Sequence, residues 1–575
     1  PSAPRPDLKI AFIGECPTRD DEMMKRPFVG AAGNIFSQCA NAAGVLRSSC
    51  FTGNVSQVRA PADNPARFTQ ASWQVQDGLA QLKKDLKKFQ PNLVVLLGDL
   101  AIKAAGERHK AEVFRGSLFK CLSPDSPFFN IKCLAGLSPV SVMRQWKLMP
   151  LFAFDMTRAR EEGLSPTLDL PARHFDLHLP PEEIIRKLEE WPTNQIASID
   201  IEGGCEQGIT CMSIAESPQY AFIIDWKNMQ QSKMPAVYDA YNIWMRRNDV
   251  PKIAQNFLYE LMCVGWNHKI PIGGMFWDTM YSGWEIYPEL PKGLGTQASI
   301  WTKEPYYKAE RTVQDDDTHN AYCCKDTTVT YEIYLRHKEW MDENPKGKAH
   351  FEFNNQLLPA FAYMQQRGIL YDQERAKEVR SELGVEMDEL QTRIDLYAGG
   401  PLNINSPKQM TTCLYKKMGF MPQYQKEKGR KTTKLTANTE ALLTLLKKHD
   451  SSLVYDILQW RGLEGVRKQL DIQLNEDGRI RAAYNPVGTE TGRLTCYGSN
   501  TGSGYNLQTT TKRLRPLFVA DPGHHIFQVD LSGADGWTVG AHSARLGDSR
   551  MLDDYNRGVK PAKVIATMYL RKDRS

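Results

Sequence analysis

The sequence predicts a multidomain α/β protein, and three observations support this fold class. The chain has 575 residues, of which 41% are hydrophobic, so it is long enough for three or four domains with their own cores. Over residues 1–345, short apolar runs alternate with helical stretches, as in α/β domains. The pattern is then mostly helical as far as residue 478, and strand signals return beyond it, which predicts a helical region followed by an α+β segment.

The composition argues against a membrane protein and against a disulfide-stabilised one. Mean hydropathy is −0.47, and no apolar run approaches the roughly 20 residues needed to cross a bilayer. The segment Pro1–Leu8 lacks a signal-peptide core. The 12 cysteines are scattered without a Cys-x-x-Cys pair, which favours reduced thiols. We therefore expect a cytoplasmic protein with no membrane partner.

Residues 1–162 are predicted to form the first α/β domain. The apolar runs Lys9–Gly14 and Leu93–Gly98 predict buried parallel strands, and Ala71–Phe89 predicts a helix between them. This segment holds 22 Lys and Arg residues against 15 Asp and Glu, a net charge of +7, whereas the whole chain carries +5. Because a positive surface attracts phosphates without reading sequence, the domain is a candidate for DNA binding.

A strand, a turn and a glycine-rich loop open this domain. They are Ile13–Pro17 and Arg26–Gly33, and Asn54 follows further along the chain. The combination resembles the uracil-DNA glycosylase superfamily, specifically its iron-sulfur branch. This resemblance implies a pocket for a flipped-out base, in which Glu15 lies beside the attacking water or the sugar, Phe28 stacks under the base and Asn54 reads its edge.

Two departures from that family limit what the resemblance implies. Leu137-Ser138-Pro139 stands where the family has His-Pro-Ser, and an aliphatic side chain cannot donate a hydrogen bond to the leaving base. The cluster cysteines are also absent, so no iron-sulfur cluster is expected. We expect this module to bind DNA or a replication partner, such as a helicase, primase or processivity factor, with at most weak uracil excision.

Residues 163–181 are rich in Pro and lack periodicity, which predicts a linker, and residues 182–345 are predicted to form a second α/β domain. In Gln195–Glu202 apolar and polar residues alternate, so Asp200 and Glu202 project from one face of a strand. Asn256 and Glu260, and likewise Tyr322 and Asp326, are four residues apart. If each pair opens a helix, its two members share one side of that helix.

Converging carboxylates without paired cysteines or histidines suit Mg²⁺ or Mn²⁺. Two such ions can activate a water and stabilise the leaving 3′ oxygen of a nucleic acid. The order of these residues resembles the DEDDy 3′-5′ exonuclease domain of family A DNA polymerases, the bacterial polymerase I type, which has a ribonuclease H-like α/β fold. The resemblance implies that Asp200, Glu202 and Asp326 hold two ions and that Tyr322 orients the attacking water. Asn256 is a candidate DNA contact, and Glu260 is a catalytic candidate that replaces the family's Asp, which leaves the rate of proofreading open.

Residues 346–478 are predicted to be helical and 479–575 to begin an α+β domain. Leucines 442, 443, 445 and 446 fall on one predicted helix, and Leu453, Ile457 and Leu458 on the next. A basic stretch around Lys431 is suited to clamping phosphates. Further on, Asp530 follows the apolar run Ile526–Val529, which predicts a carboxylate at the end of a strand.

Several motifs in this region occur in a fixed order: Thr491-Gly492-Arg493, Asn506-Leu507-Gln508, Arg513-Leu514-Arg515 and Asp530-Leu531-Ser532-Gly533-Ala534-Asp535. The ordered set resembles the thumb and the first palm segment of family A polymerases. The resemblance implies that Asp530 is a catalytic metal ligand and that Arg493, Gln508, Arg515 and Lys431 contact DNA. Asp535 stands where the family has the Glu that gates the sugar 2′ position.

The fingers helix and the second palm carboxylate of that family are missing from this sequence. Since two-metal phosphoryl transfer needs both, we expect no polymerisation by the chain as given. The leading interpretation is a family A replicative DNA polymerase of bacteriophage type, in the host cytoplasm, acting on primer-template and single-stranded DNA. A stand-alone 3′-5′ exonuclease and a non-catalytic DNA-binding clamp or scaffold are the alternatives. Mg²⁺-dependent nuclease activity would separate the clamp or scaffold from the other two.

Overall fold

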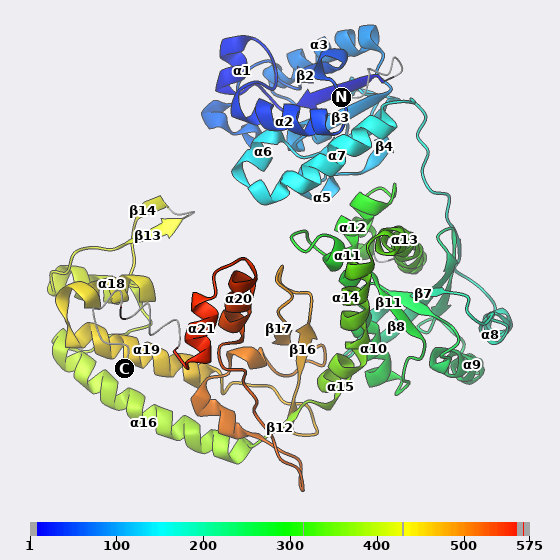
Figure 1. Cartoon of the computed structure of the whole chain (residues 1–575). Coiled ribbons are helices and arrows are strands. Elements are labelled where there is room, and N and C mark those ends of the chain that lie inside the picture. The colour runs from blue at the N-terminus through cyan, green and yellow to red at the C-terminus, as the bar shows by residue number, and fades with distance from the viewer. Residues whose placement is uncertain (1–7, 314, 428–429, 560–566, 568–575) are drawn as a thin grey trace. The chain divides into compact units, whose positions relative to one another are not determined.

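The computed structural model describes residues 8–313, 315–427, 430–559 and 567 (Figure 1). The chain forms two compact units, one of Pro1–Gly368 with Arg380–Lys512 and the other of Ile369–Val379 with Arg513–Ser575. The first unit contains two α/β sheets and a helical region. None of the helices within the described ranges is long and apolar enough to cross a membrane.

The first sheet has five strands in the order β2-β1-β3-β5-β4. Strands β1, β2, β3 and β5 are parallel and β4 is antiparallel to β5. The prediction of buried parallel strands in this region is confirmed. The strands are β1 (Ile10–Gly14), β2 (Phe51–Asn54), β3 (Leu93–Leu97), β4 (Leu118–Lys120) and β5 (Lys132–Gly136).

Helices cover both faces of this sheet. Successive residues of β1 face opposite sides, so Ile10 and Phe12 join one core while Ala11 and Ile13 join the other. The first core is closed by α2 (Gly30–Ala42), α6 (Pro139–Arg144) and α7 (Met149–Glu162), and the second by α3 (Trp73–Phe89) and α4 (Asp99–Ala104). Two short helices, α1 (Arg19–Met24) and α5 (Ala111–Phe114), complete this part.

The second sheet has six strands in the order β11-β10-β7-β8-β9-β6. Strands β7 (Ala197–Gly204), β8 (Gly208–Ser217) and β9 (Tyr220–Asp225) form an antiparallel meander, and β10 (Lys252–Ala254) and β11 (Met275–Asp278) run parallel to β7. Strand β6 (His174–Asp176) pairs with β9 and lies inside the predicted linker. The linker prediction was wrong for these three residues, because so short an edge strand shows no alternating pattern and is held through its backbone.

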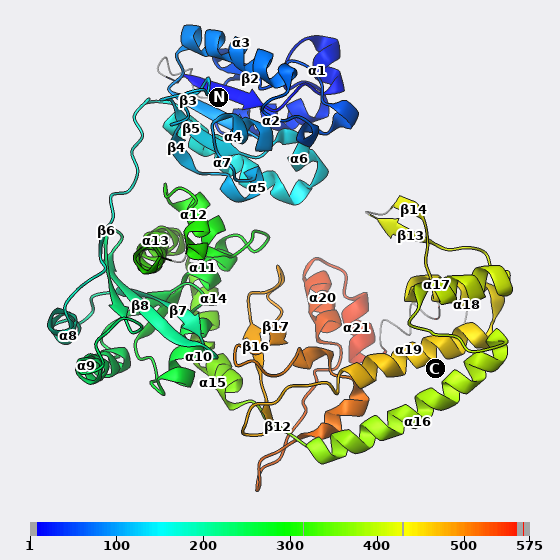
Figure 2. The same cartoon turned by 180° about the vertical axis from the view of Figure 1, so that it is seen from behind.

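Helices α8 (Pro181–Glu189) and α9 (Met234–Arg246) lie side by side at one end of this part (Figure 2). The helix α13 (Asp316–Glu343) packs on strands β7, β8 and β9, where Cys323 and Cys324 join a small core with Cys211 and Ile223. The remaining helices are α10 (Phe257–Asn267), α11 (Thr279–Ile286) and α12 (Leu294–Trp301).

The helical prediction for residues 346–478 is confirmed. The helices are α14 (Pro345–Gln356), α15 (Leu358–Arg367), α16 (Gln373–Ala398), α17 (Pro407–Thr411), a π-helical turn (Thr412–Lys417), α18 (Thr439–His449) and α19 (Ser452–Lys468). Leu442 and Leu445 are buried against Leu453 and Ile457, while Leu443 is 47% exposed. A hairpin of β13 (Tyr424–Glu427) and β14 (Arg430–Leu435) projects from these helices in both views (Figures 1 and 2). It carries the basic stretch of the sequence.

The chain then forms β15 (Arg479–Ile480) and a hairpin of β16 (Ala482–Asn485) and β17 (Thr495–Gly498). In the second unit, β12 (Ile369–Tyr371) pairs with β18 (Phe518–Val519), and α20 (Ala534–Arg545) packs on α21 (Arg550–Asn556). The prediction of a strand at Ile526–Val529 was wrong. A strand needs a neighbour to pair with, and no described residue pairs with this run, in which Phe527 is 86% and Val529 88% exposed.

Candidate functional site

Two carboxylates on β7 and one on α13 come together beside the second sheet. Asp200 and Glu202 project from one face of β7, as predicted from their alternation. One oxygen of each lies within 4.8 Å of the other and of an oxygen of Asp326. Glu202 and Asp326 are buried and Asp200 is half-buried. The structure therefore gathers the three residues that the sequence analysis assigned to metal binding.

The fourth acid, Glu260, lies in the first turn of α10. Its side chain is buried, with 2% of the residue exposed, and Oε2 has no hydrogen-bond partner among the described residues. Burial raises the pKa of Glu260 well above its usual range, and the nearby Asp200 carboxylate raises it further. A buried carboxylate oxygen without a donor is available to a cation.

Helix α10 begins one residue later than the sequence suggested. Asn256 precedes it in a left-handed conformation with φ of 66°, so Asn256 lies outside the helix. The expectation that Asn256 and Glu260 share one helix face was therefore wrong, because that spacing rule holds only within a helix. Tyr322 and Asp326 do share a side, although their helix α13 begins earlier, at Asp316.

The start of α10 is fixed by Asp278, which the sequence analysis missed. Its fully buried carboxylate accepts the N–H groups of Asn256 at 3.0 Å, Phe257 at 2.9 Å and Met280 at 2.8 Å. It thereby caps both α10 and α11. Burial raises the pKa of Asp278 to about 6, although these donors favour the ionised form. The available signal was an Asp directly before a helical run, but nothing in the sequence linked it to α10.

Two aromatic residues and a lysine complete the acidic cluster. The Tyr307 hydroxyl donates to Oδ1 of Asp326 at 2.6 Å. The ammonium of Lys308 donates to both oxygens of Asp326, at 2.7 and 2.6 Å, and to the hydroxyl oxygen of Tyr322 at 2.9 Å. Sequence reasoning missed Tyr307 and Lys308 because they lie at the start of a short 3₁₀ helix, Lys308–Thr312, that carries no recognised motif.

The electrostatics of the cluster favour a bound cation. Burial raises the pKa of Asp200 well above its usual range, and Asp326 and Glu202 raise it further. Burial also raises the pKa of Glu202, which the Arg311 guanidinium 3.9 Å away partly offsets. Like charges held together out of water are relieved by a cation, and an all-oxygen donor set fits Mg²⁺ or Mn²⁺. The residues present therefore fit the predicted metal, with Asp200, Glu202 and Asp326 as ligands and Glu260 beside them.

A second site lies in the first domain, where a pocket of about 520 Å³ is lined by Glu15, Phe28, Asn54, Leu137 and Ser138. The three residues predicted to line a base pocket are thus brought together. Asn54 and Phe28 pack closely against the backbone of Gly14 in this pocket. A Cβ atom added to Gly14 would lie 2.5 Å from Oδ1 of Asn54 and 3.0 Å from the Phe28 ring, so the pocket leaves no room for a side chain there.

The loop that carries Phe28 is held in an unusual conformation. Phe28 has a φ of 55°, a left-handed backbone that few large residues adopt. Its ring stacks on Phe36 at 4.9 Å, and Arg47 donates to its carbonyl at 2.6 Å. Strain that is over-determined in this way is typical of ligand sites.

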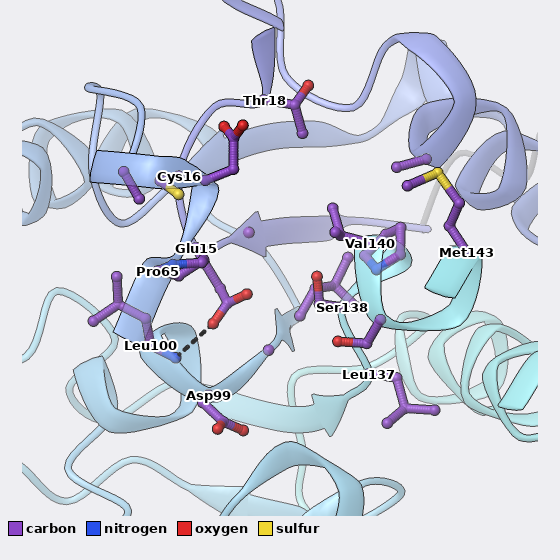
Figure 3. A pocket seen from close by; sticks show the side chains of 18 of the residues that line it. Glu15, Cys16, Thr18, Pro65, Asp99, Leu100, Leu137, Ser138, Val140 and Met143 are labelled. Atoms are coloured by element: carbon purple, nitrogen blue, oxygen red, sulfur yellow. Dashed lines mark hydrogen bonds between the residues drawn. The ribbon is translucent and has the colours of Figure 1, made fainter. Parts of the chain in front are cut away.

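Glu15 points toward the backbone of Leu100 in this pocket (Figure 3). Its Oε1 accepts the Leu100 N–H at 3.1 Å. Burial raises the pKa of Glu15 to about 7. Leu137 is 2% exposed. The pocket thus offers a carboxyl group that titrates near neutrality, but an aliphatic side chain at the position of the missing His.

The predicted residues of the last region are placed as follows. Arg493 and Gln508 are exposed in the first unit, and Gln508 donates to the carbonyl of Leu494 at 2.8 Å. Arg515, Asp530 and Asp535 are exposed in the second unit, with Asp535 in the first turn of α20. Lys431 lies on β14, and its side chain is outside the described part. Asp530 is not drawn into a carboxylate cluster among the described residues.

Comparison with known proteins identifies two regions of the chain. Residues 373–560 match the family model of DNA polymerase family A, and residues 1–157 match that of the uracil DNA glycosylase superfamily. The chain therefore carries a family A DNA polymerase region and an N-terminal region of the glycosylase superfamily, as the sequence motifs predicted.

Several curated relatives are similar to part of the chain. DNA polymerase I of Synechocystis sp. is 25% identical over 310 residues, which cover 51% of this chain and 31% of that protein. The enzyme of Chloroflexus aurantiacus is 24% identical over 380 residues, covering 60% and 38%. The thermostable DNA polymerase I of Thermus filiformis is 29% identical over 189 residues, covering 32% and 22%. The chain thus spans less than two-fifths of the length of these relatives.

A solved structure shares the fold. The POL domain of Pol1 from M. smegmatis, in complex with DNA primer-template and dNTP, matches with a TM-score of 0.54 and 18% identity. The match covers 70% of this chain and 68% of that one. Together with the family matches it confirms the predicted multidomain α/β fold class.

Proposed function

We propose that this chain functions in a replicative family A DNA polymerase that also carries a two-metal 3′-5′ proofreading exonuclease. The observation that carries the exonuclease assignment is the gathering of Asp200, Glu202 and Asp326 within 4.8 Å, with Tyr322 one helical turn from Asp326. A cluster of this kind has little structural purpose without a cation, since its members repel one another.

In the proposed reaction a frayed primer end enters the acidic cluster and loses one nucleoside monophosphate per cycle. Asp200, Glu202 and Asp326 would hold Mg²⁺ or Mn²⁺, with Glu260 as a further acidic group. When bound, the ions activate water and stabilise the leaving 3′ oxygen. The Tyr322 hydroxyl oxygen accepts from Lys308, so its own O–H is free to orient the attacking water.

The polymerase assignment rests on the family match and on the ordered motifs of residues 491–535. Asp530 is proposed as the first palm metal ligand and Asp535 as the sugar gate. Arg493, Gln508, Arg515 and Lys431 are proposed to contact primer-template, the ligand present in the M. smegmatis structure. The pairing of a glycosylase-like module with a polymerase is our ground for proposing a bacteriophage origin.

The exonuclease proposal is tested by replacing Asp200 and Glu202 together with Ala in the whole chain. The variant should bind single-stranded DNA like the wild type but should no longer degrade it in Mg²⁺. Persistent Mg²⁺-dependent degradation would refute the assignment. Absence of degradation by the wild type itself would favour the DNA-binding clamp or scaffold. A stand-alone exonuclease is disfavoured by the polymerase motifs, for which it has no use.

A second proposal concerns residues 1–162, where the observation is a shaped pocket that has Leu137 in place of the missing His. We propose that this module binds single-stranded DNA or a replication partner and excises uracil weakly or not at all. The net charge of +7 supports attraction to phosphates.

The second proposal is tested in EDTA, which silences a metal-dependent exonuclease. Single-stranded DNA with one uracil is incubated with the chain, treated with alkali and examined for strand breakage. DNA that is bound but unbroken supports a binding module. Breakage at the uracil, lost when Asn54 or Glu15 is replaced, would instead identify a working glycosylase.

A further inference from the structure

Lys308 lies inside the acidic cluster. Its ammonium contacts both oxygens of Asp326 within 2.7 Å and the Tyr322 oxygen at 2.9 Å, and it lies 4.8 Å from the centre of the Tyr322 ring. The Lys308 side chain is 22% exposed and that of Asp326 is 8% exposed. The ammonium thus satisfies both oxygens of a carboxylate that the proposed chemistry assigns to a metal ion.

A lysine in this position and a divalent ion are alternatives for the same oxygens. An ammonium donates hydrogen bonds to a carboxylate, whereas a metal ion needs the oxygen lone pairs that accept those bonds. Two positive charges in contact with one carboxylate also repel each other. Lys308 must therefore release at least one oxygen of Asp326 before an ion binds there.

The short helix that carries Lys308 brings a second cation to the cluster. This 3₁₀ helix, Lys308–Thr312, ends four residues before α13 begins, and its Arg311 lies 3.9 Å from Glu202. The Arg311 side chain is 65% exposed, so it lies at the solvent-exposed edge of the cluster beside Glu202 and not inside the cluster. Lys308 is the more deeply placed of the two.

We propose that Lys308 is a tethered cation that occupies the cluster in place of a divalent ion and lowers the affinity of the free protein for metal. This inference rests on the proposed metal-dependent exonuclease and adds a regulation to it. With Lys308 on Asp326, the carboxylates and Tyr322 keep their arrangement without metal. Loading of the ion that contacts Asp326 is then favoured when the substrate phosphate supplies additional ligands.

The test is Mn²⁺ binding by the whole chain without DNA at pH 8, measured by electron paramagnetic resonance of free Mn²⁺. If Lys308 leaves Asp326 open to metal about a tenth of the time, the wild type binds Mn²⁺ about tenfold more weakly than a protein whose site is always open. Lys308→Met should therefore bind Mn²⁺ about tenfold more tightly than the wild type. Lys308→Arg, which keeps the charge, should stay near the wild type. Unchanged or weaker binding by Lys308→Met, or an equal gain in Lys308→Arg, would overturn the proposal.

Lys325 provides a matched control. It lies beside Asp326 in sequence, but its ammonium pairs with Glu310 at 3.0 Å rather than with a cluster carboxylate. Its one printed contact with the cluster is the Tyr307 ring, whose centre is 5.1 Å from the ammonium. Lys325→Met should leave Mn²⁺ affinity unchanged, and a gain equal to that of Lys308→Met would make the effect one of general charge and overturn the proposal. The double Ala variant of Asp200 and Glu202 defines the background of unrelated Mn²⁺ sites.

Thermal unfolding gives a readout independent of activity. Without metal, Lys308→Met should melt at a lower temperature than the wild type because its carboxylates are uncompensated, and Mn²⁺ should raise its midpoint more than that of the wild type. If Lys308→Met does not fold, Lys308→Gln takes its place. If no protein binds Mn²⁺ above background, the inference fails, and Mg²⁺-dependent DNA degradation by the wild type decides the exonuclease proposal separately.

Discussion

The acidic cluster and the N-terminal pocket both hold buried carboxyl groups with raised pKa values. The two sites differ in what offsets the cost of burying these groups. In the cluster, burial raises the pKa values of Asp200, Glu202 and Glu260. The neighbouring carboxylates of the cluster, Asp326 included, raise these pKa values further. In the pocket, the pKa of Glu15 is raised mainly by burial, with a lesser contribution from the charge of Asp99. Several acids packed together are relieved by a cation, whereas Glu15, whose pKa is raised mainly by burial, can simply keep its proton. The same direction of pKa shift thus accompanies two different chemistries.

The comparison is tested most directly by replacing one acid of the cluster with a neutral side chain of nearly the same shape. Glu260→Gln should reduce exonuclease activity by about a hundredfold, comparable to the larger losses seen when support for a metal site is removed. The free energy of unfolding should not fall, because the orphaned buried acid is replaced by a neutral amide. Primer degradation in Mg²⁺ and urea unfolding measure the two effects. Loss of stability with full activity would show that Glu260 is structural.

In the pocket the corresponding change adds a donor. Leu137→His should raise uracil excision in EDTA by about tenfold to a hundredfold, since a donor aimed at developing negative charge is worth roughly that much or more. The measurement is alkali-sensitive breakage of uracil-containing DNA. Leu137→Met serves as a control of similar size that lacks a strong donor. No gain with His would show that the pocket has lost more than this one group.

The proton held by Glu15 predicts a pH dependence of stability. Between about pH 4.5 and 7 the folded state keeps a proton that the unfolded state releases, so stability falls as pH rises through this interval. The loss amounts to about 3 kcal/mol for a shift of this size. Glu15→Gln should lack this slope and be more stable than the wild type above pH 7. Urea unfolding from pH 4 to 8 tests it, and parallel curves for the two proteins would contradict the assignment.

The smallest expected effect concerns the support of the cluster. The two carboxylate oxygens of Asp278 accept three N–H groups, whereas Asp278→Asn keeps only one accepting oxygen. The change should lower the free energy of unfolding by about 1 to 2 kcal/mol, a typical loss for a helix cap. Exonuclease activity should fall with it, because α10 carries Glu260. Asp239→Asn, a conservative change on α9 away from the cluster, is the control. An unaffected exonuclease rate would mean that α10 is held in place by its core packing alone.

The sequence predicted the acidic cluster better than it predicted the last region. Asp200 and Glu202 on one strand face, and Tyr322 with Asp326 on one helix side, follow from periods that local backbone geometry imposes. Asn256 and Glu260 did not follow such a rule, because a left-handed residue ends the periodicity before α10 begins. The run Ile526–Val529 has the composition of a strand, but a strand also requires a partner that composition cannot supply.

Lys308, Tyr307 and Asp278 could not be predicted for a different reason. Each acts through a contact with a residue 18 to 22 positions away, and no local pattern reports such contacts. The pocket residues Glu15, Phe28 and Asn54 were found only through their resemblance to a family, since Gly-rich turns are usually just tight backbone. Only the structure revealed the left-handed backbone of Phe28 and the close packing of Asn54 and Phe28 against Gly14.

The shared cap at Asp278 has a consequence for the kinetics of hydrogen exchange. The amides of Asn256, Phe257 and Met280 all donate to one carboxylate, although Met280 lies more than twenty residues from the other two. When that carboxylate moves away, all three lose their acceptor at once. Their deuterium uptake should therefore rise together in a single opening event, so that the first turn of α10 and the first turn of α11 behave as one dynamic unit.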